Sequence, residues 1–491
     1  MTASQAASAS PPSILAYFKD FKVLKETPRE YWGIQLINFI DSAAYFSLLT
    51  IVTIFLSEEV HLNDTDAGYV VTLLTSLITI FLLFSGFLTD SLGIIRSLWL
   101  SLGSRLVLTG AVVLLAKAGD FQGRTFLISA ALVLMAPALA MVQTAFQSAI
   151  KRYTNVRSRS AGFNLWYLFM NVGAAGSGIM IDVMRLHFGL STVWVIGSGL
   201  ATSLLCMVAL LFLVKREEQY GEDNQFSSYS SLPQATADQG SSFWSRPYLI
   251  LKAMVSEKAF WKFVALITLL LGVRAVFTYI YLLMPKYWLR ILGPDAAIGT
   301  LNAINPVLII IGLILFIPLT NKFNIFKMLV YGAMVSALSL FALALPWQQA
   351  AAVLSSVSSY LPASWLTDPF VAAYYALSVL SMILLSIGEV IWSPKLQEYT
   401  AAIAPEGQEG SYLGLSMLPW FLAKTVVSVL SGHMLTRWVP EGIGTRLRQG
   451  EVSFWDSPEA MWLILGIVAL LGPIIALIFK NWFTKGARWQ R

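Results

Sequence analysis

Twelve long apolar stretches constrain the fold of this chain more than any other feature. A helix needs roughly 20 apolar residues to cross a lipid bilayer. Only helices and closed barrels satisfy their backbone hydrogen bonds inside lipid, so stretches of this length predict membrane-spanning helices. The expected spans are residues 33–56, 68–89, 96–117, 125–148, 160–183, 192–214, 259–284, 297–320, 326–346, 372–400, 411–435 and 459–481.

The composition excludes several classes of protein. The chain is 57% hydrophobic and 12% charged, whereas soluble domains are about 45–50% apolar and about 25% charged. One cysteine and three histidines cannot form an intrachain disulfide or an ordinary zinc site. The sequence contains no Walker motif and no recognisable Ser-His-Asp constellation. We therefore expect no enzymatic activity, no catalytic residue, no metal site and no cofactor.

The basic residues predict an orientation rather than a nucleic-acid partner. Most of the 33 Lys and Arg residues flank the spans, on the side that is cytoplasmic if the N-terminus is inside. Both termini are then cytoplasmic, and residues Ile14 to Trp32 read as an amphipathic helix on that surface. The expected domains are residues 1–32 as a cytoplasmic segment with this helix, 33–214 as a first six-helix bundle, 215–258 as a polar cytoplasmic linker, 259–481 as a second six-helix bundle, and 482–491 as a basic cytoplasmic tail.

Charged side chains stand inside several of the expected spans, among them those of Asp41, Arg274, Glu389 and Lys424. A charge at the centre of a membrane is costly, so such residues usually pair with one another or face a water-filled cavity. They commonly mark the path of an ion or a substrate. The pattern therefore indicates a transporter of small solutes whose chemistry depends on a few buried charges.

A loop motif follows the span 68–89, where the chain reads GFLTDSLGIIR. It resembles the G-x-x-x-D-R-x-G-x-x-R loop of the major facilitator superfamily, with Ser91 in place of the usual Arg. The resemblance implies an all-helical fold of twelve spans in two six-helix halves, with cytoplasmic termini and a gating role for this loop. The second half carries a weak repeat of the motif, IPLTNKFNIFK. The matching residues are Gly86, Asp90, Gly93 and Arg96.

Three further stretches are similar to the proton-coupled oligopeptide transporter family. They are LNAINPVLIII in the span 297–320, AGFNLWYLFMNVGAAGS in the span 160–183, and IGEVIWSPKLQEYTAAIAPEG in the span 372–400. The resemblance implies that Glu389 receives the amino end of a peptide and that Asn171 and Asn305 hydrogen-bond its backbone. Tyr45 keeps one aromatic of the family's motif in the first span, and we expect it to line the site together with Lys424 and Trp420.

The first span departs from that family, because it reads NFIDSAAYF where the family carries E-x-x-E-R-F-x-Y-Y. We expect Asp41 to pair with Arg274 and Glu389 to pair with Lys424 as switching pairs. The alternative for Glu389 is a purely structural ion pair with Lys424 or Arg274. A carboxylate that alternates between a cation and a proton can couple transport to protons. Arg105 is assigned to the cytoplasmic loop region, close to Arg96.

Three functions fit these observations. The first is proton-coupled symport of di- or tripeptides or peptide-like compounds. The second is a carrier of another small solute, such as an organic anion, without an obligatory proton. The third is a non-transporting sensor or a lipid-handling protein on the same fold. The expected partners are a small-molecule solute, protons and the lipid bilayer, with no nucleic acid. We expect a monomer in a plasma or inner membrane.

Overall fold

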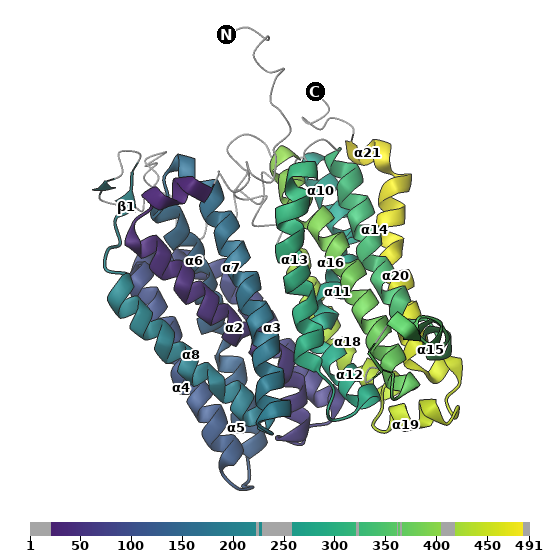
Figure 1. Ribbon diagram of the computed structural model, residues 1–491. Coiled ribbons are helices and arrows are strands. Elements are labelled where there is room, and N and C mark those ends of the chain that lie inside the picture. The colour runs from purple at the N-terminus through teal and green to yellow at the C-terminus, as the bar shows by residue number, and fades with distance from the viewer. Residues whose placement is uncertain are drawn as a thin grey trace.

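The computed structural model describes residues 21–221, 225–227, 258–320, 324–360, 362–363, 366–403 and 418–484. Figure 1 shows the helices in two bundles that stand side by side, one formed before residue 222 and one formed after residue 257. We call the end where α2 begins and α20 finishes the entry end, and the opposite end the far end. The arrangement matches the all-helical, two-bundle expectation.

The first bundle consists of helices and one small ribbon. The hairpin β1–β2 is antiparallel and pairs Gln219 with Ser227. Its elements are the 3-10 helix η1 (Phe21–Glu26), α2 (Arg29–Glu58), α3 (Asp64–Leu92), α4 (Ile94–Lys117), α5 (Arg124–Leu134), α6 (Ala136–Arg152), α7 (Val156–Asp182), the π-helix η2 (Val183–His187), α8 (Thr192–Leu213), β1 (Gln219–Tyr220) and β2 (Phe226–Ser227).

The second bundle contains more helix breaks than the first. Its elements are α10 (Lys258–Leu269), α11 (Leu271–Leu282), α12 (Met284–Leu292), α13 (Ile298–Thr320), α14 (Ile325–Leu343), α15 (Trp347–Ser356), η3 (Ser358–Tyr360), α16 (Pro369–Ile403), α18 (Leu418–Trp438), α19 (Ile443–Arg448), η5 (Phe454–Asp456), α20 (Pro458–Ile478) and α21 (Lys480–Thr484).

Within the described residues, 10 helices are long and apolar enough to cross a membrane. They coincide with ten of the twelve expected spans. The expected span 259–284 is divided at Leu270 into α10 and α11, and α18 corresponds to the expected span 411–435. Pro137 and Pro285 lie in the first turns of α6 and α12, where a proline restarts a helix without losing a hydrogen bond. The chain is an integral multi-pass membrane protein.

The chain enters the first bundle differently from the expected amphipathic helix. Residues 14–20 lie outside the described residues. From Phe21 the chain forms a short 3-10 helix, and Pro28 then caps the start of α2 in an extended conformation. The residue before a proline is disfavoured in the α conformation, which explains the break at Thr27.

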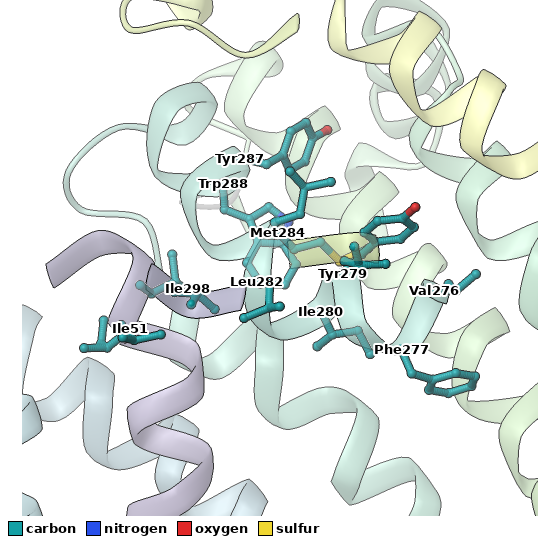
Figure 2. Packing of buried hydrophobic residues seen from close by; sticks show 14 of the residues in the cluster. Ile51, Val276, Phe277, Tyr279, Ile280, Leu282, Met284, Tyr287, Trp288 and Ile298 are labelled. Atoms are coloured by element: carbon teal, nitrogen blue, oxygen red, sulfur yellow. The ribbon is translucent and has the colours of Figure 1, made fainter. Parts of the chain in front are cut away.

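One large hydrophobic cluster joins the two bundles near the far end. Figure 2 shows Ile51 of α2 beside Ile298 of α13, with Leu282 and Met284 close by. All four side chains are buried. Because this cluster draws on both bundles, apolar packing holds them together on this side of the molecule.

Candidate functional site

An ion-pair cluster connects the bundles at the far end. Asp64, at the start of α3, lies 2.6 Å from Lys286 Nζ and 2.8 Å from Arg290 Nη1, both on α12. Lys286 also donates a hydrogen bond to Ser57 of α2. The side chains of Asp64, Lys286 and Arg290 are at most 11% exposed. Charge-assisted hydrogen bonds that are shielded from water are the strong ones, so this cluster favours contact between the bundles.

A second contact at the far end joins α7 to α13. The carboxylate of Asp182 accepts hydrogen bonds from the backbone N–H groups of Gly299, at 2.9 Å, and Thr300, at 2.6 Å. These N–H groups open α13 and have no partner inside the helix, so a carboxylate there satisfies them and complements the helix dipole. A Cβ on Gly178 would clash with the backbone oxygen of Gly299, and the two glycines therefore allow the helices to touch.

Hydroxyl and amide groups continue the contact toward the middle of the protein. Ser76 and Thr425 share a hydrogen bond of 2.7 Å between α3 and α18. Asn302 of α13 donates to Thr50 of α2 at 2.9 Å. Interhelical hydrogen bonds of this kind are common between membrane helices. Together with the Asp64 cluster, they describe a conformation whose two bundles are closed at the far end.

The predicted residues Glu389 and Asn305 meet in the second bundle. The amide of Asn305 on α13 donates to Glu389 Oε2 of α16 at 3.1 Å and to Ser386 Oγ at 3.1 Å. Asn305 is buried, whereas Glu389 is only partly buried. The carboxylate is therefore held in place by an amide and keeps acceptor capacity for a further donor.

Arg274 of α11 supplies the positive charge near Glu389. Its charge acts on Glu389, and its guanidinium lies 4.4 Å from the ring centroid of Trp392 on α16. Trp392 is itself fixed, because it is buried and its indole N–H donates to Ser336 at 3.2 Å. A guanidinium over the face of an aromatic ring is held there by the ring's electrons.

Aromatic residues from the first bundle face this part of the second bundle. Tyr167 of α7 packs against Ile309 and Val390 of the second bundle. The ring centroids of Phe46 on α2 and Tyr281 on α11 lie 5.4 Å apart. The phenol of Tyr281 lies near Glu389, Tyr167 and Tyr45. Tyr45, Phe46, Tyr167 and Tyr281 are partly buried.

Asn171 lies one turn after Tyr167 on the same helix. It is buried, and its amide donates to the backbone oxygen of Tyr167 at 2.9 Å. Among the described residues, the candidate central site thus contains one carboxylate, one guanidinium, amides and tyrosines drawn from both bundles.

The predicted pair between Asp41 and Arg274 is wrong for this conformation. Asp41 of α2 forms its ion pair with Arg105 of α4, and both side chains are buried within the first bundle. By the rise of an α-helix, both residues lie roughly 17 Å from the entry end, so Arg105 does not belong to the loop region near Arg96. The helices α2, α4 and α8 pack together, and this packing turns Asp41 away from the second bundle.

The predicted pair between Glu389 and Lys424 stays a prediction. The structure places Asn305 and Arg274 beside Glu389. Lys424 of α18 is partly buried and is next to Thr425, which bonds across to α3. The side chain of Trp420 lies outside the described residues, so its predicted place in the site stays a prediction.

The loop motif forms the turn between α3 and α4. Gly93 has a φ of 88°, in the region that favours glycine. The carboxylate of Glu217, which follows α8, accepts a hydrogen bond of 2.7 Å from the N–H of Ile95 at the start of α4. Sequence reasoning missed this cap. Arg96 is exposed, a Cβ on Gly86 would meet no atom within 4 Å, and the side chain of Asp90 lies outside the described residues.

The cap makes a prediction at Glu217. We expect Glu217→Ala to lower the free energy of unfolding in detergent by about 1–2 kcal/mol, the usual cost of a lost helix cap. Glu218→Ala is the control, because Glu218 is the neighbouring carboxylate and is exposed. Equal losses in a denaturant titration would contradict a role for Glu217.

The family follows from a comparison with known protein families. The model of the Major Facilitator Superfamily matches residues 34–365, which is more than half of the chain. The chain belongs to the Major Facilitator Superfamily. It is accordingly a membrane transporter by family and fold, and its family and fold are not those of enzymes. No curated protein matches the chain by sequence.

Solved structures of peptide transporters share the fold. The peptide transporter POT in complex with sulfate has a TM-score of 0.67 at 15% identity, over 94% of this chain and 96% of that one. The POT family transporter PepTSo has a TM-score of 0.63 at 13% identity, over 94% and 99%. A POT family transporter in complex with 5-aminolevulinic acid has a TM-score of 0.63 at 14% identity, over 94% and 100%. At these identities, the likeness is one of fold.

Proposed function

We propose that this superfamily member is a proton-coupled symporter of di- or tripeptides or peptide-like solutes that works by alternating access. The contact between bundles at the far end represents one of two alternating states. If the termini are cytoplasmic, as the basic residues favour, this state is closed toward the outside. Carriers of this superfamily place their substrate near the midplane, where the two bundles meet.

The observation that carries the proposal is the placement of Glu389. Its carboxylate is held by Asn305 at 3.1 Å and is partly exposed, so it can receive an ammonium group. Arg274, stacked on Trp392 at 4.4 Å, offers a guanidinium to the carboxylate of the same solute. Tyr45, Tyr167 and Tyr281 provide aromatic walls with hydroxyl groups. A carboxylate and a guanidinium on neighbouring helices suit a zwitterion whose amino and carboxyl groups lie at opposite ends.

Glu389 is also the proposed carrier of the coupled proton. A carboxylate that sits near a cation in one state and is desolvated in another gains and loses its proton as the two bundles move. Glu389 has both a neighbouring cation and an amide donor. Asp41 is a second candidate, although its pair with Arg105 lies wholly inside the first bundle.

One observation favours transport of an organic anion as the second candidate. The Asp41–Arg105 pair is neutral as a unit. Among the described residues of the central region, Arg274 and Lys424 then carry two positive charges and Glu389 carries one negative charge. A site with a surplus of positive charge attracts anions. Competition between solutes therefore separates the two candidates.

The test is uptake of labelled dialanine into proteoliposomes under an inward proton gradient, with three unlabelled competitors in excess. Dialanine should compete, whereas N-acetyl-dialanine, which lacks the ammonium group, and succinate should compete at least roughly 10-fold less well, the cost of losing one charge-assisted hydrogen bond. Strong competition by succinate and N-acetyl-dialanine would favour the anion carrier. Absence of dialanine uptake by folded protein would favour a carrier of another solute, and uptake of labelled succinate would then be measured. Absence of uptake of both solutes would favour the sensor or lipid-handling alternative.

A further inference from the structure

We propose that the groove between α10 and the end of α20 binds an anionic phospholipid at the entry end of the second bundle. A cavity of about 570 Å³ is lined by Ala265, Thr268, Leu269, Phe479, Trp482 and Phe483. All of these side chains are apolar except that of Thr268. Ligand pockets of a few hundred cubic ångströms with mostly apolar walls are typical of small-molecule sites. This binding site is separate from the central site around Glu389.

The geometry of the helices creates the groove. A Cβ on Gly472 of α20 would clash with the backbone oxygen of Leu269, so α10 and α20 touch there. Beyond this contact α20 ends at Ile478, and α21 begins at Lys480. Phe483 of α21 is buried and stacks on Phe326 of α14 with ring centroids 6.0 Å apart. The groove is therefore open between two anchored points.

The depth of the groove in the membrane favours a lipid as its occupant. α20 is one of the helices long enough to span the bilayer, and the groove lies where it ends. Figure 1 shows α10 and α21 together at the entry end. Trp482 is 46% exposed and Phe479 is 56% exposed, as expected for aromatic residues at a membrane interface. An acyl chain would cover the apolar walls.

Basic side chains at the rim of the groove favour an anionic headgroup. Lys262 Nζ of α10 lies 5.8 Å from the ring centroid of Trp482, across the groove. Lys480 lies in α21, between the lining residues Phe479 and Trp482. Basic pockets between membrane helices on the cytoplasmic side bind anionic headgroups.

The experiment compares phosphatidylglycerol with phosphatidylcholine on the full-length protein in detergent. Each lipid is added in defined amounts, and the bound lipid is counted by native mass spectrometry. We expect the parent protein to retain phosphatidylglycerol preferentially. The double variant Lys262→Gln/Lys480→Gln should bind it roughly 30-fold more weakly, because each basic residue near the surface contributes about a fivefold gain in affinity. Thr268→Trp, which fills the groove, should lose the bound lipid.

The chain offers a matched control. Lys117 Nζ lies 5.5 Å from the ring centroid of Trp194 at the far end of the first bundle, so the same Lys–Trp contact exists elsewhere. Lys117→Gln should leave retention of phosphatidylglycerol unchanged. Equal retention of the two lipids by the parent protein would overturn the proposal. A loss in Lys117→Gln as large as in the double variant would overturn it as well.

Discussion

Replacing Arg105 with Gln is expected to lower the free energy of unfolding by about 3–5 kcal/mol, the usual cost of leaving one partner of a buried ion pair alone. Asp41 and Arg105 are 1% and 5% exposed. Asp41 Oδ2 already has no hydrogen-bond partner among the described residues. Without the guanidinium, the carboxylate must take up a proton or draw water into the first bundle. A denaturant titration of the purified protein in detergent measures the loss.

A double-mutant cycle with Asp41→Asn separates the pair from its surroundings. The double variant has no buried charge, so it should be more stable than Arg105→Gln alone, with a coupling energy of at least about 2 kcal/mol. Asp120→Asn is the matched control, because Asp120 pairs with Arg124 at 3.0 Å but its side chain is 89% exposed. Exposed pairs contribute about 0–1 kcal/mol.

Two results would contradict the buried pair. One is a stability of Arg105→Gln within about 0.5 kcal/mol of the parent protein, the range of ordinary surface substitutions. The other is a coupling energy below about 1 kcal/mol, the upper limit for exposed ion pairs. Either result would mean that Asp41 has a partner other than Arg105 in the folded protein.

The membrane spans were predictable because each span needs its own run of roughly 20 apolar residues, which is visible directly in the sequence. Ten expected spans coincide with helices of the described chain that are long enough to cross a membrane. The break at Leu270 was not predictable from the apolar run, because Leu269, Leu270 and Leu271 are strong helix formers and give no turn signal. Tertiary packing decides there, where Gly472 brings α20 against Leu269.

The residues of the central site were partly predictable, because charged and amide side chains inside apolar spans indicate pairing or binding. Glu389 and Asn305 were expected in one site, and the structure joins them by a hydrogen bond. The pairing of the charges was not predictable, because a sequence gives the depth of a residue but not the direction in which its side chain points. Asp41 and Arg105 lie at similar distances along their spans, and this similarity indicates that they can pair. The assignment of Arg105 to the loop region hid that signal.

The contacts at the far end could not be predicted from residue types alone. Asp64, Lys286 and Arg290 stand at helix ends, where charged residues are normally solvated. Their ion pairs join helices more than 200 residues apart in the chain. Asp182 likewise reads as an interfacial charge, and its role as the cap of α13 depends on two glycines in different bundles. Such contacts arise only when the bundles assemble.

Replacing Glu389 with Gln is expected to lower proton-driven peptide uptake at least roughly 10-fold, because the charge-assisted bond to the substrate ammonium is lost. The amide keeps the size of the side chain and can still accept from Asn305, so the fold should be retained. Ser386→Ala is the control, because it removes the other acceptor of Asn305 without changing a charge. Uptake by this variant should stay within about threefold of the parent protein, since one neutral hydrogen bond contributes little.

The most direct measurement is therefore uptake of labelled dialanine into proteoliposomes, with and without an inward proton gradient, by the parent protein and by Glu389→Gln. The proposed function predicts uptake that depends on the gradient in the parent protein and is lost in the variant. Gradient-dependent uptake that is equal in both proteins would contradict the assignment of Glu389 as the group that receives the substrate.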